Sequence, residues 1–172
     1  MTDISGKPKK RSNLCTVAEC GILAALVFIG TELRIPTAVG YINLGDGVIV
    51  LASYFLGPAA FFPAAIGSAL GDLIAGYPAY IAPTFVIKGL MGLIASLIMR
   101  MSEGKKAAGV LIRISAGVVA ELIMISGYYV FEMVIYGSQA ALGSLAFNLI
   151  QGGVAVILAV PLTYMIRIRR SR

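Results

Sequence analysis

The chain contains no histidine and little charge of either sign. None of its 172 residues is histidine, and only 13% are Asp, Glu, Lys or Arg. Histidine is the side chain that titrates near neutral pH and the commonest metal ligand, so its absence argues against histidine-based catalysis and against a typical zinc site. The two cysteines, Cys15 and Cys20, are too few and too close together to frame a disulfide scaffold. We therefore expect no enzyme, no cofactor and no metal site.

Apolar residues take the place of the missing charge. They make up 59% of the chain, and the mean hydropathy is +0.91, whereas soluble domains are nearer half apolar and about a quarter charged. The length allows about six spanning helices of roughly 20 residues each. We predict one all-α integral membrane domain over residues 1–172, with no room for a nucleotide-binding domain. The net charge of +6 does not indicate nucleic-acid binding, because the basic residues gather at predicted helix ends.

Apolar runs separated by turn residues predict six transmembrane helices. The second and third are divided at Gly57-Pro58, because a proline inside a helix removes a hydrogen bond and clashes with the preceding turn. The segment 76–80 is predicted to be a short loop, and Gly137 and Ser138 are predicted to begin another. The basic segment 1–13 lacks a cleavage site after it, so we expect a retained helix to follow. The predicted helices cover about residues 14–33, 46–56, 58–75, 83–100, 108–136 and 145–168.

The basic residues indicate the orientation of these helices. With six spans, both termini lie on one side, and twelve of the fourteen basic residues fall on that side, including the segment 1–13 and the tail 167–172. The loops of the opposite side contain only Arg34. By the positive-inside rule, both termini are predicted to be cytoplasmic and the loops near 34–45, 76–82 and 137–144 to be external.

Ionisable side chains within the apolar runs predict a polar site. An ionisable group at membrane depth is costly unless it faces a partner or a wet cavity. Lys88 and Asp72 lie about four or five residues from the outer ends of their predicted helices, which places both in one layer. Tyr128 and Glu132 fall near the same depth, and Glu121 lies deeper. The expected substrate-binding residues are Tyr41, Asn43, Asp72, Tyr77, Tyr80, Lys88, Tyr128, Glu132, Asn148 and Gln151.

The same side chains allow other interpretations. They could form an internal network that locks helices together, for example through a Lys88–Asp72 or Lys88–Glu132 pair, and tyrosine favours the membrane interface in any case. A different class of protein is a proton-coupled secondary carrier, in which Asp72, Glu121 and Glu132 relay protons. A membrane-embedded enzyme is poorly supported, because the chain has no histidine and no paired-carboxylate motif.

Small residues follow one face of the first predicted helix. Ala18, Gly21 and Ala25 are spaced by three and four residues, which leaves a stripe that another helix can approach closely. The stripe is either an internal packing surface or a docking surface for another membrane subunit.

Several segments together resemble the S components, the substrate-binding subunits of energy-coupling factor (ECF) vitamin transporters. The resemblance covers nearly the whole chain, and among such proteins the chain is similar to the group associated with hydroxymethylpyrimidine or pyridoxine-like ligands. The segments that carry it are GYINLGD at 40–46, GP at 57–58, GSALGDLIAGY at 67–77, PTFVIKGLMGLI at 83–94, GYYVFEMVIYG at 127–137 and NLIQGG at 148–153.

This resemblance implies a high-affinity uptake subunit in the bacterial plasma membrane that catalyses no reaction. It implies a vitamin pocket in the outer halves of the last three helices, and a gate over residues 36–46. It also implies that Ala18, Gly21 and Ala25 dock a transmembrane T subunit, although Gly21 departs from an alanine-only stripe. Two ATP-binding-cassette ATPases would supply the energy. The residues that match the pocket-lining stretches are Lys88, Tyr128, Glu132, Asn148 and Gln151.

Overall fold

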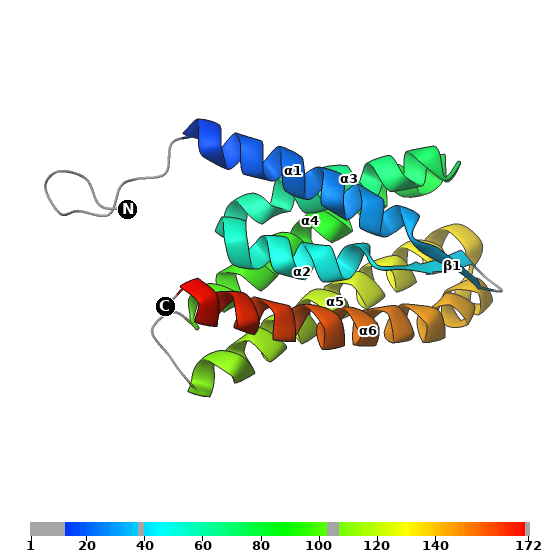
Figure 1. Cartoon of the computed structure of the whole chain (residues 1–172). Helices are drawn as coiled ribbons and strands as arrows, with labels where there is room; N and C mark the ends of the chain where they lie inside the picture. Colours follow the sequence, from blue (N-terminus) through cyan, green and yellow to red (C-terminus); the bar gives the residue numbers. More distant parts are fainter. Residues whose placement is uncertain (1–12, 38–39, 103–106, 171–172) are drawn as a thin grey trace, which may run out of the picture.

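The computed structural model describes residues 13–37, 40–102 and 107–170, and over these ranges the chain is almost entirely helical (Figure 1). Of the basic segment 1–13 only Asn13 is described, and of the tail 167–172 only the backbone of residues 167–170, which belongs to α6. A β-hairpin that was not predicted follows the first helix, and its strands pair antiparallel with Arg34 opposite Asn43. The elements are α1 (Asn13–Glu32), β1 (Arg34–Thr37), β2 (Gly40–Asn43), α2 (Gly45–Leu56), the 3₁₀ helix η1 (Gly57–Ala60), α3 (Phe61–Ile74), α4 (Pro78–Arg100), α5 (Ala107–Tyr136) and α6 (Ser138–Arg170).

Five stretches of the described chain are long and apolar enough to cross a membrane, and one of them, Gly45–Ile74, contains both α2 and α3. This stretch folds back on itself. A Cβ added to Gly45 or to Gly71 would lie 2.5 Å from an atom of the Thr31 side chain, so the start of α2 and the end of α3 lie beside the same residue. The reversal occurs at Gly57, whose φ of +60° favours glycine. The predicted break at Gly57-Pro58 is confirmed.

Two predicted helix starts are wrong. The fourth helix begins at Pro78 rather than near residue 83, so Tyr80 lies in α4 and not in a loop. Proline suits the first turn of a helix because its fixed φ is helical and its missing N–H has no helical partner there. The last helix begins at Ser138 rather than near residue 145, because Gly137, with φ of +88°, reverses the chain alone.

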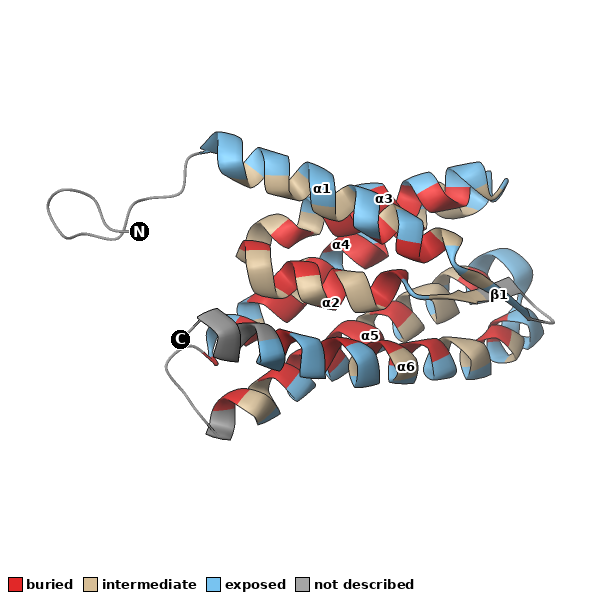
Figure 2. Cartoon of the chain, viewed as in Figure 1, coloured by how far each residue is buried: buried red, intermediate tan, exposed pale blue. Residues whose placement is uncertain are grey.

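The inward faces of the helices are buried and the outward faces are exposed (Figure 2). Many of the buried residues are alanine, and large apolar residues are exposed on the outside. A Cβ on Gly67 would lie 2.5 Å from the Ala24 carbonyl oxygen, and one on Gly92 would lie 2.7 Å from that of Ala60. These glycines allow α3 to approach α1 and α4 to approach η1. The main core cluster contains Val27, Ile49, Ala64, Ile87, Met91, Ala95, Ala120 and Met124.

The two ends of the bundle differ. The hairpin, the turn between α3 and α4 and the turn at Gly137 gather at one end, which we call the hairpin end (Figure 1). The start of α1 and the end of α6 lie at the other end (Figure 1). The fold therefore brings the ends of α3, α4, α5 and α6 that are nearest the hairpin together beneath it.

Candidate functional site

A cavity of about 110 Å³ opens at the hairpin end of the bundle. Its wall combines hydroxyl, amide and carboxylate groups with one ammonium group and several aromatic rings. The lining residues come from α1, β2, α3, α4, α5 and α6, and from the turn before α4. The lining residues are Thr31, Asn43, Ser68, Asp72, Tyr77, Tyr80, Thr84, Lys88, Tyr128, Glu132, Ser144, Phe147, Asn148 and Gln151.

Nine of the ten residues predicted to bind substrate line this cavity. The tenth, Tyr41, lies in β2, and its side chain is outside the described residues. The hydroxyl residues of the wall and Phe147 were not predicted, because uncharged side chains of these kinds are ordinary in membrane helices. The hydroxyl residues are Thr31, Ser68, Thr84 and Ser144.

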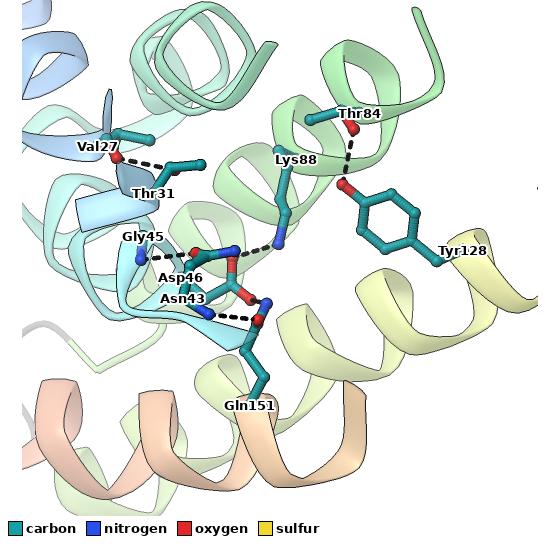
Figure 3. A network of polar contacts seen from close by, with 9 residues as sticks. All are labelled: Val27, Thr31, Asn43, Gly45, Asp46, Thr84, Lys88, Tyr128 and Gln151. Atoms are coloured by element: carbon teal, nitrogen blue, oxygen red, sulfur yellow. Dashed lines mark hydrogen bonds and ion pairs between the residues drawn. The ribbon is translucent and has the colours of Figure 1, made fainter. Parts of the chain in front are cut away.

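A buried ion pair joins α4 to the start of α2 (Figure 3). Lys88 Nζ donates to Asp46 Oδ1, and the two residues are 3% and 0% exposed. Gln151 Nε2 donates to the other carboxylate oxygen of Asp46 at 2.6 Å. The Gln151 Oε1 accepts the backbone N–H of Asn43 at 2.8 Å. One carboxylate and one amide therefore connect α2, α4, α6 and the hairpin.

The partner of Lys88 differs from both pairs proposed from the sequence. Of the described residues, Asp46 forms the ion pair with Lys88, and neither Asp72 nor Glu132 does. Glu132 instead accepts hydrogen bonds from Tyr80 Oη at 3.2 Å and from Ser144 Oγ. Asp46 was missed as a site residue because it begins α2, and its position opposite α4 depends on how these helices cross. The Lys88–Asp72 and Lys88–Glu132 pairs are therefore wrong.

Aromatic rings surround Tyr80, which lines the cavity. The Tyr80 ring lies 5.0 Å from that of Phe131 and 6.2 Å from that of Tyr136, centroid to centroid. It also lies 6.1 Å from the Tyr77 ring and 6.3 Å from the Tyr128 ring. We call these five residues the aromatic cluster. Such rings present flat apolar faces on which a planar ligand can stack.

Tyr128 connects this cluster to the ion pair. Its hydroxyl shares a 2.8 Å hydrogen bond with Thr84 Oγ1 (Figure 3). The Lys88 ammonium lies 5.5 Å from the centre of the Tyr128 ring, within the range of a cation–π interaction. The polar and the aromatic sides of the cavity are thus one continuous set of contacts.

The three carboxylates of the carrier hypothesis do not share one surface. Asp72 and Glu132 line the cavity, whereas Glu121 does not. Glu121 is 3% exposed and lies against α6, where a Cβ on Gly152 would approach its Cβ to 3.0 Å. Neither of its carboxylate oxygens has a hydrogen-bond partner in the described part of the chain. The structure therefore places Glu121 between helices and outside the cavity wall.

The small-residue stripe lies on the outside of the bundle. Ala18, Gly21 and Ala25 are all exposed, and a Cβ added to Gly21 would meet no atom within 4 Å. The other face of α1 is the one that packs on α3, through Ala24 and Val27. The stripe is therefore not an internal packing surface of this chain.

Comparisons with known proteins agree with this architecture. The family model described as "ECF-type riboflavin transporter, S component" matches residues 11–168. A solved structure described as "Structure and mechanism of the S component of a bacterial ECF transporter" superposes with a TM-score of 0.73 at 20% identity. That match covers 94% of this chain and 100% of the other. It shows the same fold.

A Pyrococcus woesei protein described as "Uncharacterized protein in gap 3'region" is 34% identical over 140 residues, which cover 80% of this chain and 90% of that protein. Its description assigns no activity. The family model matches nearly the whole chain, and a solved S component shares its helical fold. The family match establishes the class of the protein. The chain belongs to the family of ECF-type riboflavin transporter S components, and so to the substrate-binding subunits of ECF transporters.

Proposed function

We propose that this S component captures a small, water-soluble vitamin or vitamin precursor and delivers it to an ATP-driven importer. One observation carries this proposal. Nine of the ten polar and tyrosine side chains predicted to bind substrate line a single cavity, although they come from widely separated parts of the chain. Small-molecule sites combine apolar walls with a few placed polar groups in this way.

The size of the cavity favours a ligand with one ring. Its volume of about 110 Å³ is similar to that of the ~150 Å³ cavity known to hold benzene. A six-membered heteroaromatic ring with short substituents matches this space better than the three fused rings of riboflavin. We therefore favour hydroxymethylpyrimidine or a pyridoxine-like compound. Its ring would stack near Tyr80 and Tyr128, and Asn148 would read its polar substituents.

The orientation that we propose has six passes and both termini in the cytoplasm, with the hairpin end facing outward from the plasma membrane. Arg100, at the end of α4, and Arg113, whose Nη1 donates to the Thr163 carbonyl at 2.7 Å, support it. Both lie away from the hairpin end, on the side that the positive-inside rule assigns to the cytoplasm. The cavity would then open toward the ligand supply.

The hairpin and the start of α2 are the proposed gate over the cavity. Asn43 and Asp46 lie in this segment, and both are held by Gln151 of α6. Opening this gate would require breaking these two contacts and the ion pair between Asp46 and Lys88.

We further propose that the stripe of Ala18, Gly21 and Ala25 docks a transmembrane T subunit, which two ATP-binding-cassette ATPases accompany. Its exposure and the open space beside Gly21 support this role. Small residues allow another helix to come close where the bilayer offers no hydrophobic driving force between helices.

Ligand binding by the purified full chain tests the proposal. We expect thermal stabilisation by hydroxymethylpyrimidine or pyridoxine, because a ligand at a hundred times its Kd adds about 2.7 kcal/mol to the free energy of unfolding. No stabilisation by these compounds, thiamin or riboflavin would contradict the proposal. Uptake into proteoliposomes by this chain alone, driven by a pH gradient and lost on Glu121→Gln, would favour the carrier instead.

A further inference from the structure

Glu132 is a buried acid in the cavity wall whose partners are hydroxyl groups. It is 9% exposed, and its two oxygens accept from Tyr80 and Ser144. No ion pair within the described ranges includes Glu132. A carboxylate at membrane depth is costly without an opposite charge, so its presence in the wall calls for a reason.

The cation of the cavity wall is already used. Among the lining residues that the structure describes, Lys88 supplies the only Lys or Arg side chain, and it forms its ion pair with Asp46. Gln151 holds the second oxygen of Asp46 and fixes this arrangement. The cavity thus has a neutralised pair at one side and carboxyl groups, Asp72 and Glu132, elsewhere in its wall.

The surroundings of Glu132 also suit a positive charge. Tyr80, which bonds Glu132, is at the centre of the aromatic cluster, with the Phe131 ring 5.0 Å and the Tyr128 ring 6.3 Å away. The faces of aromatic rings are electron-rich and attract cations, most strongly where water is excluded. A carboxylate beside several rings is a chemically suitable site for a protonated amine or a cationic ring nitrogen.

We infer that the ligand itself supplies the missing cation: a heteroaromatic compound with a protonated amino group or positively charged ring nitrogen, which pairs with Glu132 and lies against Tyr80. This inference rests on the proposed function and narrows its ligand class. It disfavours phosphorylated forms of the same ring, because a phosphate would meet Asp72 and Glu132 in the cavity wall.

The test compares cationic and neutral probes on the full-length protein by isothermal titration calorimetry. Pyridoxamine and pyridoxine form a matched pair, since they differ in an amine against a hydroxyl. Thiamin and hydroxymethylpyrimidine form a second pair, since both contain the same pyrimidine ring and thiamin adds a cationic ring nitrogen. We expect the cationic member of each pair to bind at least about 30-fold more tightly than the neutral member. Removing one partner of a buried charge pair weakens binding by at least this much.

Two variants of Glu132 and one control locate the effect. Glu132→Gln should remove the preference for the cation, and Glu132→Asp should retain most of it. Tyr128→Phe, which keeps the ring in the same wall, should weaken both members of a pair alike. Melting curves establish that each variant is folded, and Glu132→Asp keeps the test decisive if Glu132→Gln does not fold.

The possible failures are distinct. If a neutral probe binds as tightly as its cationic counterpart, or if the preference survives in Glu132→Gln, the inference is overturned and the proposed function stands. If none of the four probes binds, the proposed function is overturned with it.

Discussion

Gln151 and Asp46 are 105 residues apart in the chain, and the side-chain amide of the first donates to the carboxylate of the second at 2.6 Å. The same amide accepts the backbone N–H of Asn43 at 2.8 Å. A single α6 side chain therefore holds both the end of the hairpin and the start of α2. Replacing the Gln151 side chain should therefore loosen the hairpin and the start of α2 more than it loosens the packing of the helices.

Replacing Gln151 with leucine should loosen the hairpin. The Asn43 amide loses its acceptor, so its hydrogen exchange should accelerate by about tenfold, as expected for the loss of one hydrogen bond of ~1 kcal/mol or more. Hydrogen exchange of the ligand-free protein, read out over residues 34–46, measures this. Asn148→Leu, one helical turn away in the same wall, is the control. Equal exchange in both variants would show that Gln151 does not hold the hairpin.

Replacing Asp46 with asparagine should destabilise the protein. It leaves the Lys88 ammonium buried without an opposite charge, and breaking a buried pair in this way costs about 3–5 kcal/mol. The double variant Asp46→Asn with Lys88→Met should recover much of this loss, because no unpaired charge remains. Unfolding in detergent gives the free energies.

Glu32→Gln is the matched control for that experiment. It breaks the ion pair between Glu32 and Arg34, in which the Glu32 side chain is 31% exposed and the Arg34 side chain 22%. Ion pairs near the surface contribute about 0–1 kcal/mol. If the double variant were no more stable than Asp46→Asn alone, the coupling between Asp46 and Lys88 would be refuted.

Adding a methyl group at Gly67 should push α1 away from α3. The new Cβ would lie 2.5 Å from the Ala24 carbonyl oxygen and 2.8 Å from the Val27 Cβ, neither of which can rotate away. Overpacking of this kind costs about 1–3 kcal/mol. Gly21→Ala, on the exposed side of α1, meets no atom within 4 Å and should leave the melting temperature unchanged or raise it. A similar melting temperature for both variants would contradict the close contact.

Enlarging the stripe on α1 should prevent assembly without affecting ligand binding. Ala25→Leu fills the surface where the T subunit is proposed to dock, so co-purification of the T subunit should fall several-fold. The ligand affinity of the isolated chain should stay the same, because the stripe is outside the cavity wall. Val118→Leu, exposed on α5, controls for a larger apolar side chain elsewhere. Normal assembly of the Ala25 variant would exclude this docking surface.

Features that depend on neighbouring residues could be predicted from the sequence. The break at Gly57-Pro58 and the turn at Gly137 were found because turn chemistry is local. The depth of the site was predicted less well, because the count for Lys88 started from a wrong helix start. Lys88 lies ten residues from the start of α4 at Pro78, whereas Asp72 lies two residues from the end of α3 at Ile74. Pro78 was misread as part of a loop, although proline also begins helices.

Features that depend on helix crossings could not be predicted. Which carboxylate faces Lys88 is decided by how α2 and α4 cross, and the sequence offers no local signal for Asp46 over Asp72 or Glu132. The hairpin was missed because its pairing, Arg34 with Asn43, has no strong alternating pattern in so short a segment. Hydroxyl residues such as Thr84 are too common in membrane helices to indicate a cavity.

The hairpin restricts where the edge of the bilayer can lie. A sheet of only two strands leaves the outward-facing amides and carbonyls of each strand without a partner in the sheet. Hydrocarbon cannot satisfy such groups, so β1 and β2 must sit where water or the headgroup region reaches them. α2 starts directly below and spans only about 18 Å, well short of the ~30 Å hydrocarbon core. No residue of α2 is exposed, so the neighbouring helices enclose this short segment, and it needs no bilayer of matching thickness beside it.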